Sequence, residues 1–206
     1  NSSRADAGDR PSNLVSLPTT VNLKWQRMMR RHVQHHWRMG KSYSMQAEFR
    51  SFQLTHRDSD ISIIKYVQEI IRRPKYISDN ELYGVDDYWA TPEEFFEYGG
   101  DCEDAAIAAY FLLKDIGWPI HDLWLVISDS LIDHRTHAYL AVKANEYWYA
   151  IDQAQERVTF LISQRQIYRT LYIINEMKIV AAGIDESEPN STVVPIHKNA
   201  PVAIRQ

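Results

Sequence analysis

Apolar residues recur at helical spacing in the first half of the chain, in 22–39, in 60–73 and again beyond its single cysteine. This spacing places them on one face of each segment and predicts three amphipathic helices. Thr91 and Pro92 are residue types that begin a short additional helix, which follows a polar, aromatic loop at 78–90. The positions expected to be buried are Leu23, Met28, Val33 and Trp37 in the first helix, Ile61, Ile64, Val67, Ile70 and Ile71 in the second, and Ala106, Ala109, Tyr110 and Leu113 in the helix after the cysteine.

Beyond residue 117 the pattern changes to short segments rich in aromatic and β-branched residues, which are typical of strands. Asn145 lies in the tight connection between two of them, where asparagine tolerates the positive φ of a hairpin turn. The predicted strands are 122–128, 137–143, 146–152, 157–161 and 171–174, with 177–182 as an edge strand. Helices followed by an antiparallel sheet predict an α+β domain.

The composition predicts one folded domain with two polar ends. A chain of 206 residues, 45% of them hydrophobic, buries one sizeable core. Residues 1–20 are polar with little periodicity, and 185–206 contain several prolines. We therefore expect a flexible N-terminal arm, a domain at 21–184, and an extended or disordered tail.

Charge and hydropathy exclude two classes of partner. The net charge of −4 gives no general attraction to nucleic acid or to anionic membranes. No apolar run approaches the roughly 20 residues that span a bilayer. The single cysteine excludes an intrachain disulfide. We therefore expect neither a nucleic-acid partner nor a membrane-spanning segment.

The first predicted helix is basic and rich in histidine. Its basic residues, which include Arg27 and Arg30, usually form a solvated face, and a docking surface for an acidic partner is the alternative. His32, His35 and His36 have the i, i+3, i+4 spacing that brings imidazoles together for a metal. Because no acidic or cysteine ligand accompanies them, we do not expect a zinc site there.

The strongest chemical signal surrounds Cys102, the only cysteine in the chain. Gly99 and Gly100 allow a sharp turn and a close backbone approach just before it. Asp101 is a good helix N-cap, and Asp104 three residues later completes a capping box. The cysteine therefore falls in the first helical turn, where unpaired N–H groups and the helix dipole favour a thiolate. We expect a nucleophile here rather than a buried structural cysteine.

A cysteine nucleophile needs a general base, and the base needs a group that orients it. Among eight histidines, His137 begins a predicted strand just after the cysteine helix, and the strand across the hairpin ends at Asp152. Adjacent antiparallel strands hold an imidazole and a carboxylate side by side. The alternative is that both are ordinary polar residues at strand ends. We predict a triad of Cys102, His137 and Asp152, with the cysteine backbone N–H as an oxyanion donor.

The motif Gly-Asp-Cys-Glu-Asp at 100–104, with Tyr-Trp-Ala-Thr-Pro at 88–92 before it and His137 and Asp152 after it, resembles the bacterial transglutaminase-like cysteine proteinases. The resemblance extends over 25–183. It implies a papain-like fold in the transglutaminase arrangement, with the three predicted residues at the triad positions. It further implies a periplasmic protease that cleaves a large surface adhesin after an alanine pair, controls biofilm attachment, and is sequestered by an inner-membrane receptor for cyclic di-GMP.

The same resemblance implies a calcium ion held by the acids beside the nucleophile, Asp101 and Glu103. A physical argument supports it, because Asp101, Glu103 and Asp104 place like charges beside a thiol that must ionise. A divalent cation on these carboxylate oxygens would cancel that effect and fix the loop. The alternative is that these acids only cap the helix.

Two other functions stay open at this point. The thioester formed by a cysteine nucleophile is resolved by water in a protease and by an amine in a transglutaminase-type acyltransferase. A non-catalytic binding module of the same fold is less favoured, because no triad residue is missing. We therefore expect a calcium-dependent cysteine endopeptidase.

Overall fold

The computed structural model describes residues 19–36 and 40–181. Trp37, the predicted tail and most of the predicted N-terminal arm lie outside these residues. The helices before the sheet are α1 (Thr19–His35), α2 (Gly40–Thr55), α3 (Asp60–Ile71), α4 (Asp79–Tyr83), α5 (Pro92–Tyr98) and α6 (Cys102–Asp115). A 3-10 turn, η1 (Ile120–Asp122), leads into β1 (Leu123–Ser130), β2 (Thr136–Ala144), β3 (Tyr147–Ile151), β4 (Thr159–Phe160), α7 (Leu161–Gln164), β5 (Tyr168–Ile174) and β6 (Ile179–Ala181). In this part of the chain no helix is both long and apolar enough to cross a membrane.

The six strands form one antiparallel sheet in the order β4-β3-β2-β1-β5-β6. The predicted α+β class is confirmed. Asn145 has a positive φ in the turn between β2 and β3, as the hairpin prediction requires. The predicted strand at 157–161 is shortened to β4, because Leu161 begins α7, and β5 begins earlier than predicted, at Tyr168.

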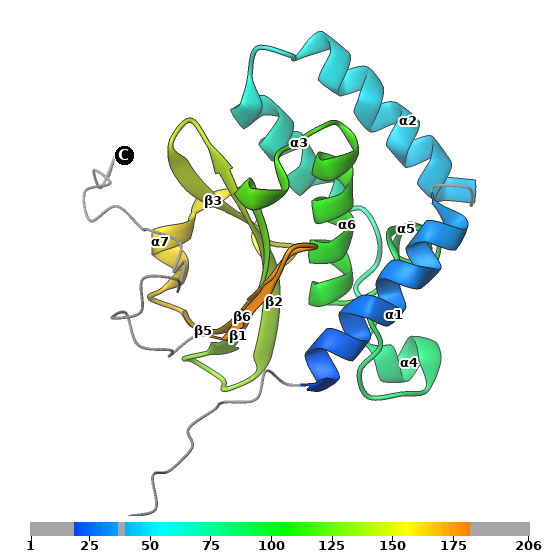
Figure 1. The fold of residues 1–206 in the computed structure, drawn as a ribbon, viewed down its shortest axis with the longest axis vertical. Coiled ribbons are helices and arrows are strands. Elements are labelled where there is room, and N and C mark those ends of the chain that lie inside the picture. The colour runs from blue at the N-terminus through cyan, green and yellow to red at the C-terminus, as the bar shows by residue number, and fades with distance from the viewer. Residues whose placement is uncertain (1–18, 37–39, 182–206) are drawn as a thin grey trace, which may run out of the picture.

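Figure 1 shows the helices α1 to α6 on one side of the sheet and α7 on the other. Alternate side chains of the strands therefore enter two different cores. Leu125 and Leu140 belong to the large core under the helices. Their neighbours Trp124 and Tyr139 belong to a smaller core that contains Leu161 of α7. This alternation is the period of two expected for strands covered on both faces.

Helix α6 occupies the centre of the fold and is buried on all sides from Asp104 to Leu113. The four apolar positions predicted for this helix are confirmed as buried. The helix contacts β1 and β2 on one side and α3 and α5 on the other, so it needs apolar residues all round. In α3 the predicted positions are also buried, except Ile61, which is half-buried.

The buried face of α1 differs from the prediction. Leu23 is 41% exposed and Val33 is 72% exposed, so their predicted burial is wrong, whereas that of Met28 is confirmed. The buried face instead joins Met28 to His32, which retains helical spacing. A histidine fits there because its Nδ1 lies 3.0 Å from Oε1 of Glu93, a buried carboxylate on α5. An apolar pattern alone does not reveal such a polar pair.

The sequence pattern gives no signal for α2 or α4. In α2 the fully buried residues are Ser42 and Phe49, too few to produce an apolar period. In α4 the side chain of Ser78 caps the helix start, and Gly84 ends it with a φ of 70°. The prediction of a loop throughout 78–90 is therefore wrong over the five residues of α4.

Two glycines bring the backbone before α6 against a neighbouring segment. The N–H of Gly100 donates to the carbonyl oxygen of Lys75 at 3.3 Å. Gly99 has a φ of 91°, and a Cβ there would lie 2.5 Å from that same carbonyl oxygen. A Cβ at Gly100 would collide with the carboxyl group of Asp104. The two glycines therefore fix the position at which the cysteine begins its helix.

Gly99→Ala should lower the free energy of unfolding more than Gly117→Ala does. The two glycines have φ values of 91° and 93°, which residues with a Cβ rarely adopt, so both substitutions strain the backbone, by about 1–3 kcal/mol. Only at Gly99 does the added methyl group meet backbone atoms, which adds about 1–3 kcal/mol. Chemical denaturation of both variants measures the difference, and equal losses would show that the close approach to Lys75 is not needed.

Candidate active site

Cys102 is the first residue of α6, and its side chain is half-buried. The residue before it, Asp101, is the N-cap, and its backbone N–H donates to Oδ2 of Asp104 at 3.2 Å, as the predicted capping box requires. The thiol of Cys102 donates to Oε2 of Glu103 at 3.2 Å. A carboxylate is thus in direct contact with the sulfur.

The surroundings of Cys102 oppose ionisation of its thiol. Burial raises the pKa of Cys102 well above its ordinary value, and the charges of Glu103 and Asp101 raise it further. The backbone N–H of Ala138 bonds to the sulfur and lowers the pKa. Because Ala138 follows His137 in β2, this contact also places the start of β2 beside the sulfur. Without a compensating positive charge, the group is a protonated thiol at neutral pH.

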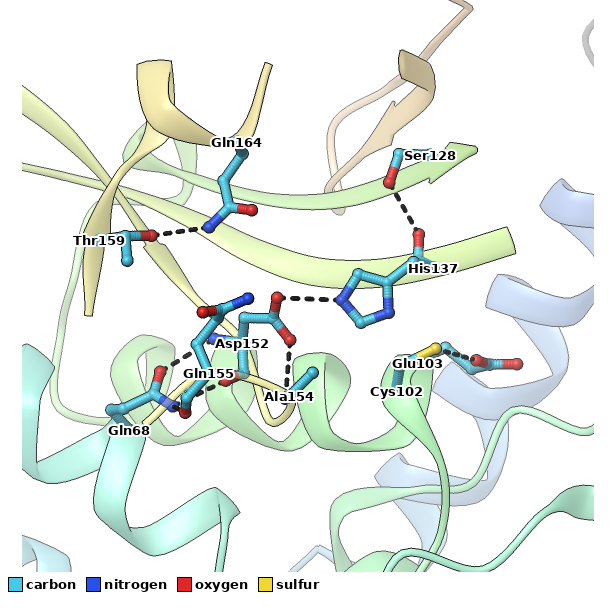
Figure 2. A network of polar contacts seen from close by, with 10 residues as sticks. All are labelled: Gln68, Cys102, Glu103, Ser128, His137, Asp152, Ala154, Gln155, Thr159 and Gln164. Atoms are coloured by element: carbon cyan, nitrogen blue, oxygen red, sulfur yellow. Dashed lines mark hydrogen bonds and ion pairs between the residues drawn. The ribbon is translucent and has the colours of Figure 1, made fainter. Parts of the chain in front are cut away.

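His137 and Asp152 are brought into contact by the hairpin of β2 and β3. Nε2 of His137 lies 3.0 Å from Oδ2 of Asp152, which directly follows β3. Figure 2 shows the other ring nitrogen of His137 on the side of Cys102. Oδ1 of Asp152 accepts a bond from the N–H of Ala154 at 2.9 Å. The contact predicted from adjacent strands is therefore present, and the carboxylate has a partner for each oxygen.

Two further residues in this region were not predicted. The ring of Tyr168 stacks on the imidazole of His137 with a centroid distance of 4.8 Å and an interplanar angle of 23°. The side chain of Gln68 bonds to the backbone of Asp152. Tyr168 has no sequence signal, because it lies before the strand predicted at 171–174. Gln68 has one, because it is a polar residue beside buried apolar positions of α3.

Carboxylate groups from three segments meet beside the cysteine. Oxygen atoms of Asp79, Asp87 and Glu103 lie within 4.8 Å of one another, and so do those of Asp79, Asp101 and Asp104. The predicted metal ligands Asp101 and Glu103 are both members of this cluster. Asp79 and Asp87 were missed, because the segment that carries them was predicted as a polar, aromatic loop without metal ligands.

The carboxylate cluster fits a hard divalent cation. Oδ1 of Asp79 and Oδ1 of Asp101 are buried, and neither has a hydrogen-bond partner among the described residues. Burial and neighbouring carboxylates raise the pKa of Asp79 to about 6 and that of Asp101 to about 10. The pKa of Asp104 is also raised, first by burial and then by the charge of Glu103. Ca²⁺ binds carboxylate oxygens, and its positive charge would offset the repulsion among these acids.

The histidines of α1 lie apart from this chemistry. His32 is paired with Glu93, while His35 and His36 are exposed. None of them belongs to a group of potential metal ligands among the described residues. The basic face is partly used within the chain, since Lys24 forms an ion pair with Asp87.

The sequence of 19–175 matches the family of bacterial transglutaminase-like cysteine proteinases. The chain belongs to this family. The matched region contains Cys102, His137 and Asp152, and membership makes the protein a cysteine protease. The resemblance read from the motif at 100–104 is confirmed. A comparison with curated proteins found no match.

Solved structures of LapG from Legionella pneumophila share the fold of this transglutaminase-like cysteine proteinase. The calcium-bound form is 22% identical, covers 81% of this chain and 92% of that chain, and has a TM-score of 0.59. Another LapG structure is 25% identical, with coverages of 69% and 88% and a TM-score of 0.54. The EGTA-treated form is 24% identical, with coverages of 69% and 86% and a TM-score of 0.54.

In the chain without a bound cation, Asp79 should make the free energy of unfolding fall as the pH rises from about 4 to about 6. The pKa of Asp79 is raised from 3.8 to about 6, so the folded chain binds more protons than the unfolded chain in this interval. Stability that is fully present below the unfolded pKa is then lost as the buried carboxyl ionises.

Asp79→Asn should remove this part of the pH dependence. Asp86→Asn is the matched control, because Asp86 is an exposed carboxylate in the same segment. Urea denaturation at a series of pH values, with chelator present, gives the three profiles. If the wild-type and Asp79→Asn profiles run parallel from about pH 4 to about pH 6, the pKa of Asp79 is not raised by folding.

Proposed function

We propose that the chain is a calcium-dependent cysteine endopeptidase. In this proposal Cys102 is the nucleophile, His137 is the general base and acid, and Asp152 orients the imidazole. The observation that carries it is the 3.0 Å contact between Nε2 of His137 and Oδ2 of Asp152. His137 lies on β2, and the backbone N–H of the next residue, Ala138, bonds to the sulfur of Cys102. Because Asp152 contacts Nε2 of the imidazole, Nδ1 is left to accept the proton of the thiol, as a general base must.

Acylation begins when His137 takes the proton of the Cys102 thiol. The thiolate attacks the carbonyl carbon of the scissile peptide bond, and the carbonyl oxygen becomes an oxyanion. The backbone N–H of Cys102, at the start of α6, is suited to donate to that oxyanion. The imidazolium then gives its proton to the leaving amine, the C–N bond breaks, and a thioester is left on the sulfur.

Deacylation reverses the use of the same groups. His137 takes a proton from water, the hydroxide attacks the thioester, and the carboxylic acid leaves as the sulfur recovers its proton. The carboxylate of Asp152 stabilises the imidazolium in both steps. It is suited to this role because its side chain is fully buried and hydrogen-bonded at both oxygens.

We place the calcium ion in the carboxylate cluster, with Asp101 and Glu103 as ligands and Asp79, Asp87 and Asp104 as further candidates. The two unpartnered oxygens, of Asp79 and Asp101, support this placement. A bound ion would supply positive charge that compensates these acids beside the thiol. The calcium-bound LapG structure supports calcium as the metal.

The substrate and location are proposed from the family resemblance. We infer a periplasmic enzyme that cleaves a large exported protein, such as a surface adhesin, at small residues of the Ala-Ala type. Such an enzyme would control biofilm attachment and would be sequestered by an inner-membrane receptor for cyclic di-GMP. Acyl transfer to an amine, and a purely binding role, are the alternatives that the activity test separates.

Wild-type protein with calcium should cleave members of a proteome-derived peptide library at small residues. Cys102→Ala should abolish cleavage, and Asp152→Ala should lower kcat by about 10²–10⁴-fold, because the imidazole loses the side chain that orients it. Chelation should also abolish cleavage. Mass spectrometry of the products measures each effect.

The same assay contains the results that would contradict the proposal. Cleavage that persists at full rate in excess chelator would show that the acids beside Cys102 only cap the helix and bind no calcium needed for activity. Exclusive formation of amides when an amine is added would identify an acyltransferase. Cleavage without preference for small residues would contradict the proposed adhesin-type substrate but not the proposed protease activity.

A further inference from the structure

Gln68 is a buried polar residue in a helix whose other buried residues are apolar. It is 2% exposed and lies on α3 beside Val67, Ile64 and Ile71. An amide in such a place costs free energy unless its polar atoms find partners. A substitution by leucine or methionine would satisfy the packing of the core. The polar group therefore needs an explanation outside the core.

The amide of Gln68 is bonded entirely to the backbone that follows β3. Its Nε2 donates to the carbonyl oxygen of Asp152 at 2.7 Å and to that of Gln155 at 2.8 Å. Its Oε1 accepts from the N–H of Asp152 at 2.9 Å. The side chain thus pairs with residue 152 in both directions, as a neighbouring strand would. Figure 2 shows this arrangement next to the imidazole.

These hydrogen bonds lie just beyond the end of β3, where the backbone no longer pairs with β2. Ile151 is the last residue of β3 and pairs with Leu140 of β2, and Asp152 lies one residue beyond it. Within the turn, Oδ1 of Asp152 accepts from the N–H of Ala154. The remaining oxygen, Oδ2, meets the imidazole of His137 at 3.0 Å. The direction of that carboxylate is therefore set by a turn that Gln68 ties to α3.

We propose that Gln68 is a positioning residue for catalysis, which holds the turn at 152–155 so that the carboxylate of Asp152 meets His137. This inference rests on the proposed function of Asp152. Helix α3 also contacts α6, the helix that begins at the nucleophile. The turn that carries Asp152 and the helix that begins at Cys102 thus share α3 as a neighbour.

The test compares the same substitution at two buried glutamines. Gln68→Met keeps the length and apolar packing of the side chain and removes its hydrogen bonds. Gln164→Met is the matched control, because Gln164 is also 2% exposed and bonds through Nε2 to Thr159 Oγ1 at 2.7 Å, on α7. If Gln68→Met does not yield folded protein, Gln68→Leu replaces it, because it also removes all three hydrogen bonds and keeps an apolar side chain in the core.

Gln68→Met should lower kcat by about 10²-fold with little change in KM, as expected for a misplaced catalytic group. The acidic limb of its kcat/KM profile should move to lower pH, because His137 must be deprotonated to accept the thiol proton and its imidazolium loses part of the stabilisation from the carboxylate. Gln164→Met should leave both quantities at the wild-type values. A purely structural role would reduce the fraction of folded enzyme without moving the pH profile.

A second readout needs no substrate. In protein with ¹⁵N-labelled histidine, NMR reports the proton that His137 Nε2 shares with Asp152. Its low-field resonance should be present in the wild type and in Gln164→Met, and lost or shifted in Gln68→Met. If this pattern appears but the wild type cleaves no peptide, the proposed function fails and the positioning stands. A folded Gln68→Met enzyme with wild-type kcat, pH profile and resonance would overturn the inference.

Discussion

The arrangement of the molecule depends on an electrostatic conflict at the first turn of α6. The helix start favours a negative sulfur, whereas the charges of Glu103 and Asp101 and the burial of the thiol favour the protonated form. Part of the conflict is fixed by the fold, because Asp101, whose charge opposes ionisation of the thiol, is bonded through its backbone N–H to Asp104. The carboxylate of Asp104 caps the helix and accepts the N–H of Ala90 at 2.7 Å. A cation in the carboxylate cluster is the direct way to resolve it.

The rest of the fold holds the reacting groups around that point. Helix α6 is buried on all sides, so its first residue cannot shift without disturbing the core. The hairpin of β2 and β3 brings His137 and Asp152 to the same place. Helix α3 contacts both parts and bonds the turn that carries Asp152. Nucleophile, base and carboxylate thus come from separate elements that share one core.

Local chemistry was predictable from the sequence, and so was the hairpin of β2 and β3. The glycines, the capping acids and Cys102 are consecutive, so no knowledge of the tertiary structure was needed to group them. The contact of His137 with Asp152 followed from a hairpin with a short turn. These features depend on neighbours in sequence or on one strand register.

Other features depended on tertiary contacts and were not predictable. Asp79 lies near the carboxylates of Asp101 and Glu103 through tertiary contacts of α4 and the loop after it, which an apolar pattern does not encode. Helix α2 buries too few apolar residues to show a period. In α1 the burial of His32 was not predictable, because the histidine depends on a partner, Glu93, that is 61 residues away. Gln68 had a signal, but its partner lies 84 residues away.

The most direct test of the account is a titration of the Cys102 thiol with and without calcium. Because the chain has a single cysteine, the pH dependence of its alkylation by iodoacetamide, followed by mass spectrometry, reports on this residue alone. With chelator, the apparent pKa should lie above the ordinary value, in the direction that burial and the acids impose. With saturating calcium it should fall, as the bound charge compensates the carboxylate cluster. An identical titration curve in both conditions would contradict the claim that the cluster controls the nucleophile.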